Sequence, residues 1–172
     1  IHLNCKLKGV ADTEYRLMAE LANQLGANVP PTGLPTNQVY KDFLYNLENK
    51  GVKLIIILDE MDEIVEKIGD ELLYKLTRIN NELKDSEISI VGISNKLNFL
   101  EGIDPRVKSS LSEEEILFPP YNALQLQTIL KERSKEACRE GVIGEGVIEK
   151  CAAFAANSDG DVRKALEILR IA

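Results

Sequence analysis

Apolar and polar positions in the first part of the chain predict helices that alternate with strands. Residues 1–5 alternate between apolar and polar side chains, which is the period of a short strand. Apolar residues at helical spacing then predict a helix that is capped by Asp12 or Thr13 and runs to about Leu25. A second helix is predicted to begin with Thr36 as its cap and to end before Gly51.

Two uninterrupted apolar runs predict strands that are buried on both faces. The first is KLIIIL (53–58) and the second is ISIVGIS (88–94), and such runs are typical of parallel sheets that lie between helices. An amphipathic helix over 70–84 separates them. Residues 115–118 (EILF) predict a fourth strand, which the prolines at 119–120 stop.

Only helical patterns follow from Asn122 onward. Apolar spacing predicts three short helices, the last of them with Asp161 as its N-cap. Strands that alternate with helices, followed by helices alone, predict an α/β layer with a small helical annex. We therefore divide the chain into an α/β core over residues 1–120 and an all-helical subdomain over residues 121–172.

Charge and composition restrict the function. The 172 residues include 21 Lys and Arg against 28 Asp and Glu, a net charge of −7, so a DNA contact would have to be local or come from another domain. His2 is the only histidine, which argues against a histidine triad and against a histidine-ligated metal site. The longest apolar run, 54–58, is too short to span a membrane, so we expect no membrane partner.

The three cysteines indicate the cellular compartment of the protein, and its first residues indicate whether the sequence is part of a longer chain. Cys5, Cys138 and Cys151 form no CxxC pair, which argues against a zinc site and favours reduced thiols in a cytoplasmic protein. The start, IHLNCKLKG, has neither a signal peptide nor an initiator Met and opens in a strand-like pattern, so we expect a fragment of a longer protein.

The clearest candidate chemistry follows the first apolar run, in LIIILDEMD (54–62). Asp59 and Glu60 lie where that strand ends, and ligands of open α/β sheets bind at this edge. Asp59 is placed for a hydrated Mg²⁺, and Glu60 is placed to polarise an attacking water. The alternative is that both acids end a strand and face solvent, and this motif alone leaves the two interpretations about even.

Three further polar residues are weak signals when taken singly. Asn95 follows the second apolar run, where an amide can hold a water or a terminal phosphate. Arg106 lies beside a proline in DPRVKSSL and Arg163 lies in GDVRKAL, and each presents a permanent charge suited to phosphate. Taken singly, the asparagine is more typical of a turn and each arginine of a solvated surface.

In this order, the motifs resemble one family. ILDEMD, GISN, DPRVKSSL, SEEEILFPPYNALQL and GDVRKAL look like the archaeal relatives of the origin recognition complex and cell division control initiators, which are AAA+ ATPases. NCKLKGVADTEYRLMAELANQLG and TGLP resemble the family's segment just after its nucleotide-binding helix, so the resemblance covers essentially the whole chain.

The resemblance implies a fold and a set of roles. The fold would be an AAA+ P-loop-type parallel sheet that lacks its first strand, followed by a helical lid, with ATP or ADP and Mg²⁺ as cofactors. Asp59 would support Mg²⁺ as its ligand, and Glu60 would orient the hydrolytic water. Asn95 would sense the γ-phosphate, Arg106 would act as an arginine finger on ATP of a neighbouring subunit, and Arg163 would reach ATP from the lid.

The implied function is that of a DNA replication initiator. It would bind and hydrolyse ATP to control origin DNA binding, assembly with neighbouring AAA+ subunits and loading of the replicative helicase. Lys6, Lys8 and Arg16 are candidate contacts to duplex DNA, although a solvated helix face is the better interpretation of these three.

Departures from the family pattern leave the enzymatic status open. No GxxxxGK[ST] occurs, so we expect this chain alone to bind ATP weakly or not at all. The family's missing strand would lie between 88–94 and 115–118, and its winged-helix DNA-binding domain is also lacking. The alternatives are a nucleotide-independent interaction module and another AAA+ protein such as a clamp-loader subunit, although DPRVKSSL differs from that class's serine-arginine-cysteine finger motif.

Overall fold

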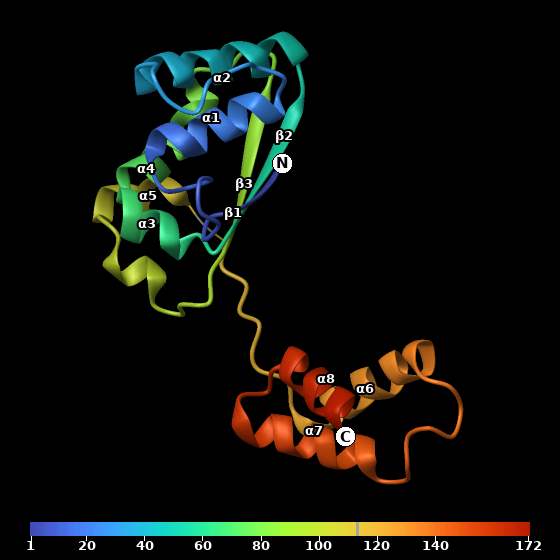
Figure 1. Cartoon of the computed structure of the whole chain (residues 1–172). Helices are drawn as coiled ribbons and strands as arrows, with labels where there is room; N and C mark the ends of the chain where they lie inside the picture. The colour runs from blue at the N-terminus through green and yellow to red at the C-terminus, as the bar shows by residue number, and fades with distance from the viewer. Residues whose placement is uncertain (113) are drawn as a thin grey trace. The chain divides into compact units, whose positions relative to one another are not determined.

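The computed structural model describes residues 1–112 and 114–172. The chain divides into two compact units, Ile1–Glu113 and Glu114–Ala172 (Figure 1). Within the described residues, none of the helices combines the length and the apolar character that a membrane crossing requires.

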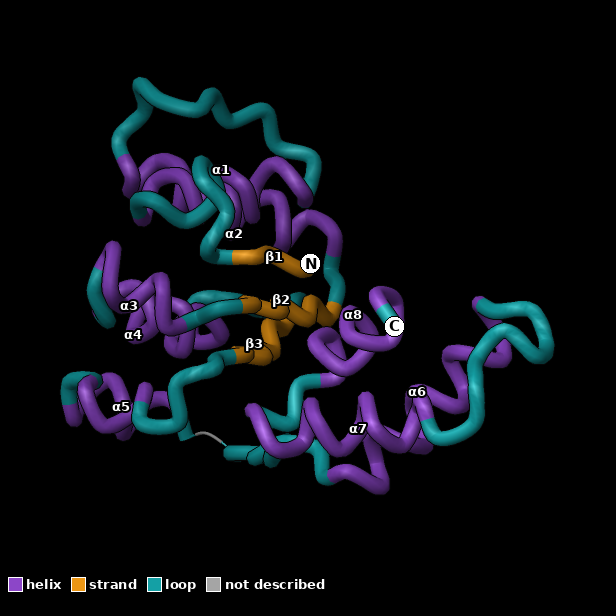
Figure 2. The backbone as a smooth tube through the Cα atoms, turned by 60° about the horizontal axis from the view of Figure 1, so that its bottom comes forward, coloured by secondary structure: helices purple, strands orange, loops and turns teal. Residues whose placement is uncertain are grey.

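A three-stranded parallel sheet forms the centre of the first unit. Its strands lie in the order β1 (His2–Asn4), β2 (Lys53–Asp59), β3 (Glu87–Ile93). Asn4 is in register with Asp59, and Asp59 is in register with Ile93, so the carboxyl ends of all three strands meet at one edge (Figure 2). The predicted strands within 1–5, 53–58 and 88–94 are confirmed.

Helices of the first unit lie on one side of this sheet (Figure 1). They are α1 (Glu14–Gln24), α2 (Thr36–Lys50), α3 (Asp62–Ile68), α4 (Glu71–Arg78) and α5 (Pro105–Leu111), with 3₁₀ turns η1 (Ile79–Asn81) and η2 (Phe99–Gly102). Of the two predicted caps of α1, Asp12 and Thr13, the structure selects Thr13, because its hydroxyl accepts a hydrogen bond from the Arg16 amide at 3.2 Å.

Two predicted helix ends are wrong. Thr36 is the first residue of α2 rather than its cap, and Pro35 holds the N-cap position without a side-chain hydrogen bond. The helix predicted over 70–84 ends at Arg78 and continues as η1. The Asn80 side chain bonds both the amide and the carbonyl of Ile88 at 2.8 Å, which ties the chain to the start of β3 and competes with further helix.

Burial on both faces of the strands, as predicted, is wrong within this unit. Ile56 and Leu58 are fully buried against the helices, whereas Ile55 on the opposite face of β2 is 56% exposed. Val91 and Ile93 of β3 share that open face and are each 46% exposed. Strand residues alternate between faces, so helices on a single side bury only every second side chain.

The fourth strand predicted at 115–118 is absent from the described residues. Ile116, Leu117 and Phe118 belong to no helix or strand and have no strand partner in the described residues, and Phe118 is 85% exposed. An isolated strand leaves its backbone groups without a ladder, so an apolar pattern alone does not create one.

Three helices form the second unit, namely α6 (Ala123–Ala137), α7 (Val147–Ser158) and α8 (Val162–Ile171). Leu126, Leu130 and Ala155 belong to its small core. Asp161 is the N-cap of α8, as predicted, because its carboxylate accepts a hydrogen bond from the Arg163 amide at 2.8 Å.

The turn between α7 and α8 packs closely on the chain that enters α6. The Tyr121 amide donates to the Gly160 carbonyl at 3.2 Å. Gly160 has a φ of 66°, and a Cβ at this position would lie 2.7 Å from the Tyr121 carbonyl oxygen. Only glycine fits both the left-handed backbone and the close approach.

Candidate functional site

The sheet register brings three of the predicted site residues to one edge. Asp59 ends β2, Glu60 follows it, and Asn95 comes shortly after β3, which ends at Ile93. The Met61 amide donates to the Ile93 carbonyl at 2.9 Å, so the turn after β2 is tied to the end of β3. This edge is the position at which open parallel sheets bind ligands.

Asp59 is half-buried and is held from the neighbouring strand. The Asn4 side-chain amide, at the end of β1, donates to Asp59 Oδ2 at 3.3 Å. Within the described residues, Asp59 Oδ1 makes no hydrogen bond, which leaves it available to a ligand. Sequence reasoning missed Asn4, although a polar residue at the end of a predicted strand was the available signal.

Glu60 lies in a strained backbone conformation. Its φ of 55° is in the left-handed region, which costs a residue with a Cβ about 1 kcal/mol. Its carboxylate forms an ion pair with Lys6 Nζ at 3.4 Å, and the Glu60 side chain is 23% exposed. Strain of this kind clusters at functional sites, where the surrounding structure holds it in place.

A buried acid that sequence reasoning missed lies next to these residues. Asp62 begins α3 and is 7% exposed. Its Oδ1 accepts a hydrogen bond from Ser94 Oγ at 2.9 Å, and its Oδ2 lies 3.4 Å from Lys96 Nζ. Glu66 also contacts Lys96, and its hydrogen bond raises the pKa of the lysine. The signal was the third acid of DEMD.

Cys5 lies next to Asp59, and its thiol is unreactive. Its amide donates to the Asp59 carbonyl at 2.9 Å, and its thiol is fully buried. Burial raises the pKa of Cys5 to about 11, and the negative charge of Asp59 adds to this effect. The thiol is therefore protonated at neutral pH and supplies no nucleophile.

Arg106 forms no hydrogen bond or ion pair with Asp59, Glu60 or Asn95 in the described residues. It lies in α5 with its side chain 86% exposed. Its guanidinium donates two hydrogen bonds to the Asp104 carboxylate, from Nε to Oδ1 at 3.1 Å and from Nη2 to Oδ2 at 3.0 Å. These bonds hold the pKa of the Asp104 carboxyl below its usual value. The arginine lines an open cavity of about 350 Å³ together with Asp70, Glu71, Tyr74, Asp104 and Val107.

Arg163 lies in the second unit, at the second position of α8, and it is exposed. Its side chain is thus carried by a body separate from the one that holds Asp59, Glu60 and Asn95. Three of the five predicted residues therefore lie at the sheet edge of the first unit.

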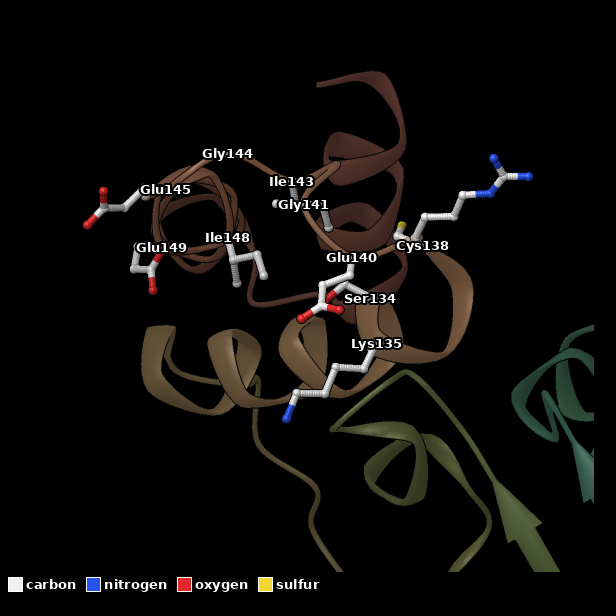
Figure 3. A pocket seen from close by; sticks show the side chains of 12 residues that line it. Ser134, Lys135, Cys138, Glu140, Gly141, Ile143, Gly144, Glu145, Ile148 and Glu149 are labelled. Carbon is white, nitrogen blue, oxygen red and sulfur yellow. The ribbon is translucent and has the colours of Figure 1, made fainter.

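The second unit has a hollow of its own, of about 560 Å³, between the end of α6 and the start of α7 (Figure 3). Lys135, Glu145 and Glu149 are among its lining residues, and so is Cys138, which is exposed (Figure 3). Charges of both signs line this hollow without converging on a point, which does not indicate a ligand.

The side chains at the sheet edge suit a magnesium ion whose other ligands come from the phosphates of a substrate. Asp59, Glu60 and Asn95 offer only oxygen and amide groups, and Mg²⁺ prefers oxygen ligands and keeps several waters. In the part of the chain that the structure describes, no group of three or more His, Cys, Asp or Glu is placed to hold a metal. One carboxylate is enough where substrate phosphates supply the other ligands.

Comparison with known proteins identifies the family. Residues 127–172 match the profile of the Cdc6 AAA+ ATPase-type lid domain. Over 170 residues, 99% of this chain, it is 54% identical to the ORC1-type DNA replication protein 1 of Archaeoglobus fulgidus. The chain belongs to the archaeal ORC1/Cdc6 family. It is also 51% identical over 176 residues to the ORC1-type DNA replication protein of Pyrococcus furiosus.

Solved structures of the ORC1/Cdc6 family have the same fold. The Aeropyrum pernix ORC1 protein, solved in complex with DNA, matches 99% of this chain with a TM-score of 0.86 and 44% identity. Cdc6p from Pyrobaculum aerophilum matches 99% of the chain with a TM-score of 0.77 at 21% identity, which supports the fold alone. The parallel sheet with its helices and the helical lid are therefore those of an AAA+ protein, as predicted.

This chain spans about two-fifths of the length of its ORC1-type relatives. It covers 41% of the Archaeoglobus fulgidus and Pyrococcus furiosus proteins and 43% of the Aeropyrum pernix chain. The activity and partners of a whole protein of this family are accordingly proposals for this chain.

Proposed function

We propose that this chain carries part of the ATPase site of a DNA replication initiator. The observation that carries the proposal is the meeting of Asp59, Glu60 and Asn95 at one edge of a parallel sheet, in a chain that is 54% identical to an ORC1-type protein. We assign the ATPase core to residues 1–120 and the lid to residues 121–172.

At the sheet edge, each side chain has one role. Glu60 accepts a hydrogen bond from the attacking water and orients it, and Asn95 donates its amide to the γ-phosphate. Asp59, whose Oδ1 makes no hydrogen bond in the described residues, would hold Mg²⁺. When bound, Mg²⁺ neutralises the charge of the phosphate oxygens.

The two arginines act from outside this edge. Arg106 acts on ATP that is bound by a neighbouring subunit. Its side chain is 86% exposed and is therefore accessible to that subunit. Arginines in this role contribute roughly 10³- to 10⁵-fold in rate. Arg163 reaches the same kind of phosphate from the lid. The parent protein then uses ATP to control its grip on origin DNA and its loading of the replicative helicase, in the cytoplasm.

A titration of a fluorescent ATP analogue with Mg²⁺ tests this function. Two proteins are compared, the present chain and a version extended upstream to the length of its relatives. We expect tight binding by the extended version and weak or no binding by the chain alone, which has no GxxxxGK[ST] loop. Tight binding by the short chain would mean that phosphate is held elsewhere.

The Glu60→Gln variant of the extended protein tests the mechanism. It keeps the shape of the side chain but removes the charge that orients water, so we expect ATP to bind normally and turnover to be lost. Undiminished hydrolysis would remove Glu60 from this role.

A nucleotide-independent interaction module is the second candidate. The open sheet face with Ile55, Val91 and Ile93 and the exposed residues 116–118 favour it, because large exposed apolar patches mark contact surfaces. This candidate becomes the leading one if neither protein binds the analogue.

A further inference from the structure

The loop that carries Asn95 is held in place by contacts with Asp62, which begins α3 directly after the turn that follows β2. Asn95 is exposed, and its own side chain makes no hydrogen bond within the described residues. Its neighbours on both sides are held, because Ser94 Oγ donates to Asp62 Oδ1 at 2.9 Å and Lys96 Nζ lies 3.4 Å from Asp62 Oδ2. The Lys96 amide also donates to Ser94 Oγ at 3.0 Å, which closes a tight turn around Asn95.

Asp62 is itself fixed to the acids of the site. It follows Asp59 by three residues and Glu60 by two, and it is one of the two polar side chains buried in the described residues. Two further contacts join this turn to β3. The Met61 amide donates to the Ile93 carbonyl at 2.9 Å, and Gly92 leaves room for Met61 Sδ, which a Cβ on residue 92 would overlap.

A buried carboxylate is costly unless hydrogen bonds and charge compensate it. Asp62 meets this requirement only while Ser94 and Lys96 keep their places, so the loop and the acid turn stabilise one geometry together. Glu66, which is exposed, contacts Lys96 but does not reach Ser94. The hydroxyl bond to Asp62 is therefore the specific tie between the two motifs.

We infer that Asp62 is a positioning residue: through Ser94 it sets where Asn95 lies relative to Asp59 and Glu60. It touches no reacting atom in this role. The consequence for hydrolysis rests on the proposed function, but the mechanical tie between Asp62 and the loop does not. A displacement of about 1 Å at a reacting centre lowers rates by as much as about 100-fold.

Hydrogen–deuterium exchange on the chain itself tests the tie without nucleotide. Ser94→Ala removes one hydroxyl, and Asp62→Asn keeps the shape while it removes the charge. We expect amides of residues 94–98 to exchange several-fold faster in both variants, with β2 unchanged. Glu66→Gln is the matched control, since it removes the other acid that contacts Lys96 and leaves the Ser94 bond intact.

Unchanged exchange in the loop, or equal acceleration in β2, would overturn the inference, because the first shows no tie and the second shows global loosening. The extended protein gives the second readout. There, Asp62→Asn should lower kcat about 10-fold or more while the dissociation constant for ATP stays within about twofold. A kcat that matches the wild type would refute the catalytic consequence.

These outcomes separate the inference from the proposed function. If Glu60→Gln hydrolyses ATP as fast as the wild type, the proposed site fails, and the exchange measurement still decides whether Asp62 holds the loop. If Glu60→Gln is inactive and Ser94→Ala is unaltered in exchange and kcat, the site stands and Asp62 has no positioning role.

Discussion

Gly160→Ala should destabilise the second unit far more than an ordinary glycine replacement. The added Cβ would lie 2.7 Å from the Tyr121 carbonyl oxygen, 2.8 Å from the Pro120 Cβ and 3.0 Å from the Tyr121 nitrogen. Two of these three atoms are backbone and cannot rotate away. The residue also has a φ of 66°, which disfavours any side chain.

The expected loss is the sum of two effects. The left-handed backbone costs alanine about 1 kcal/mol, and the overlap adds about 1 to 3 kcal/mol by analogy with overpacked cores. The total of about 2 to 4 kcal/mol is a large share of the stability of so small a unit. Each kcal/mol lowers the melting temperature of a small domain by roughly 4 to 8 °C.

Gly141→Ala is the matched control within the same unit. Gly141 has a φ of 81°, and a Cβ there meets nothing within 4 Å, so this variant suffers only the backbone effect of about 1 kcal/mol. Urea unfolding is followed by far-UV circular dichroism and by hydrogen exchange in residues 147–172. Equal losses in the two variants would refute the argument, because the contact with Tyr121 would then contribute nothing.

Three other predictions follow from single side chains. Glu60→Gly should raise the stability of the first unit by about 1 kcal/mol in urea unfolding, since glycine tolerates a φ of 55°; a lower stability would show that the side chain holds the turn. Folding raises the pKa of the Cys5 thiol from 9.0 to about 11, so the thiol stays protonated to a higher pH in the folded state than in the unfolded state. Its contribution to stability is therefore present below pH 9 and declines as the pH rises toward 11. Cys5→Ala should abolish that part of the decline, and a pH profile identical to the wild type would contradict the assignment. Arg106→Ala should leave thermal unfolding unchanged and lower ATP hydrolysis only in assembled subunits of the extended protein; equal loss in a dilute monomer would argue against action on a neighbour.

Much of the site was predictable because it follows the ends of strands. A run such as KLIIIL can be read as a strand from local composition, and polar residues after such a run lie at the carboxyl edge of any parallel sheet. Asp59, Glu60 and Asn95 were found in this way. Their roles in hydrolysis stay predictions, as do those of Arg106 and Arg163.

Asn4 and Asp62 were missed because their importance depends on pairing. Nothing near Asn4 in the sequence indicates that β1 lies in register with β2, which is what places its amide 3.3 Å from the Asp59 carboxylate. Asp62 reads as one more acid in an acidic stretch. Its burial and its bond to Ser94 arise only when β2 and β3 lie side by side.

The sequence by itself determined the helices and strands with strong local patterns, the cap at Asp161, the choice of Asp12 or Thr13 as the first cap, and the order of polar motifs along the chain. Only the tertiary structure decided which strand faces are buried and that residues 115–118 have no strand partner among the described residues. The physical reason is one of range. Periodicity and capping are interactions between residues a few positions apart, whereas a ladder, a buried face and a shared carboxylate need partners from distant parts of the chain.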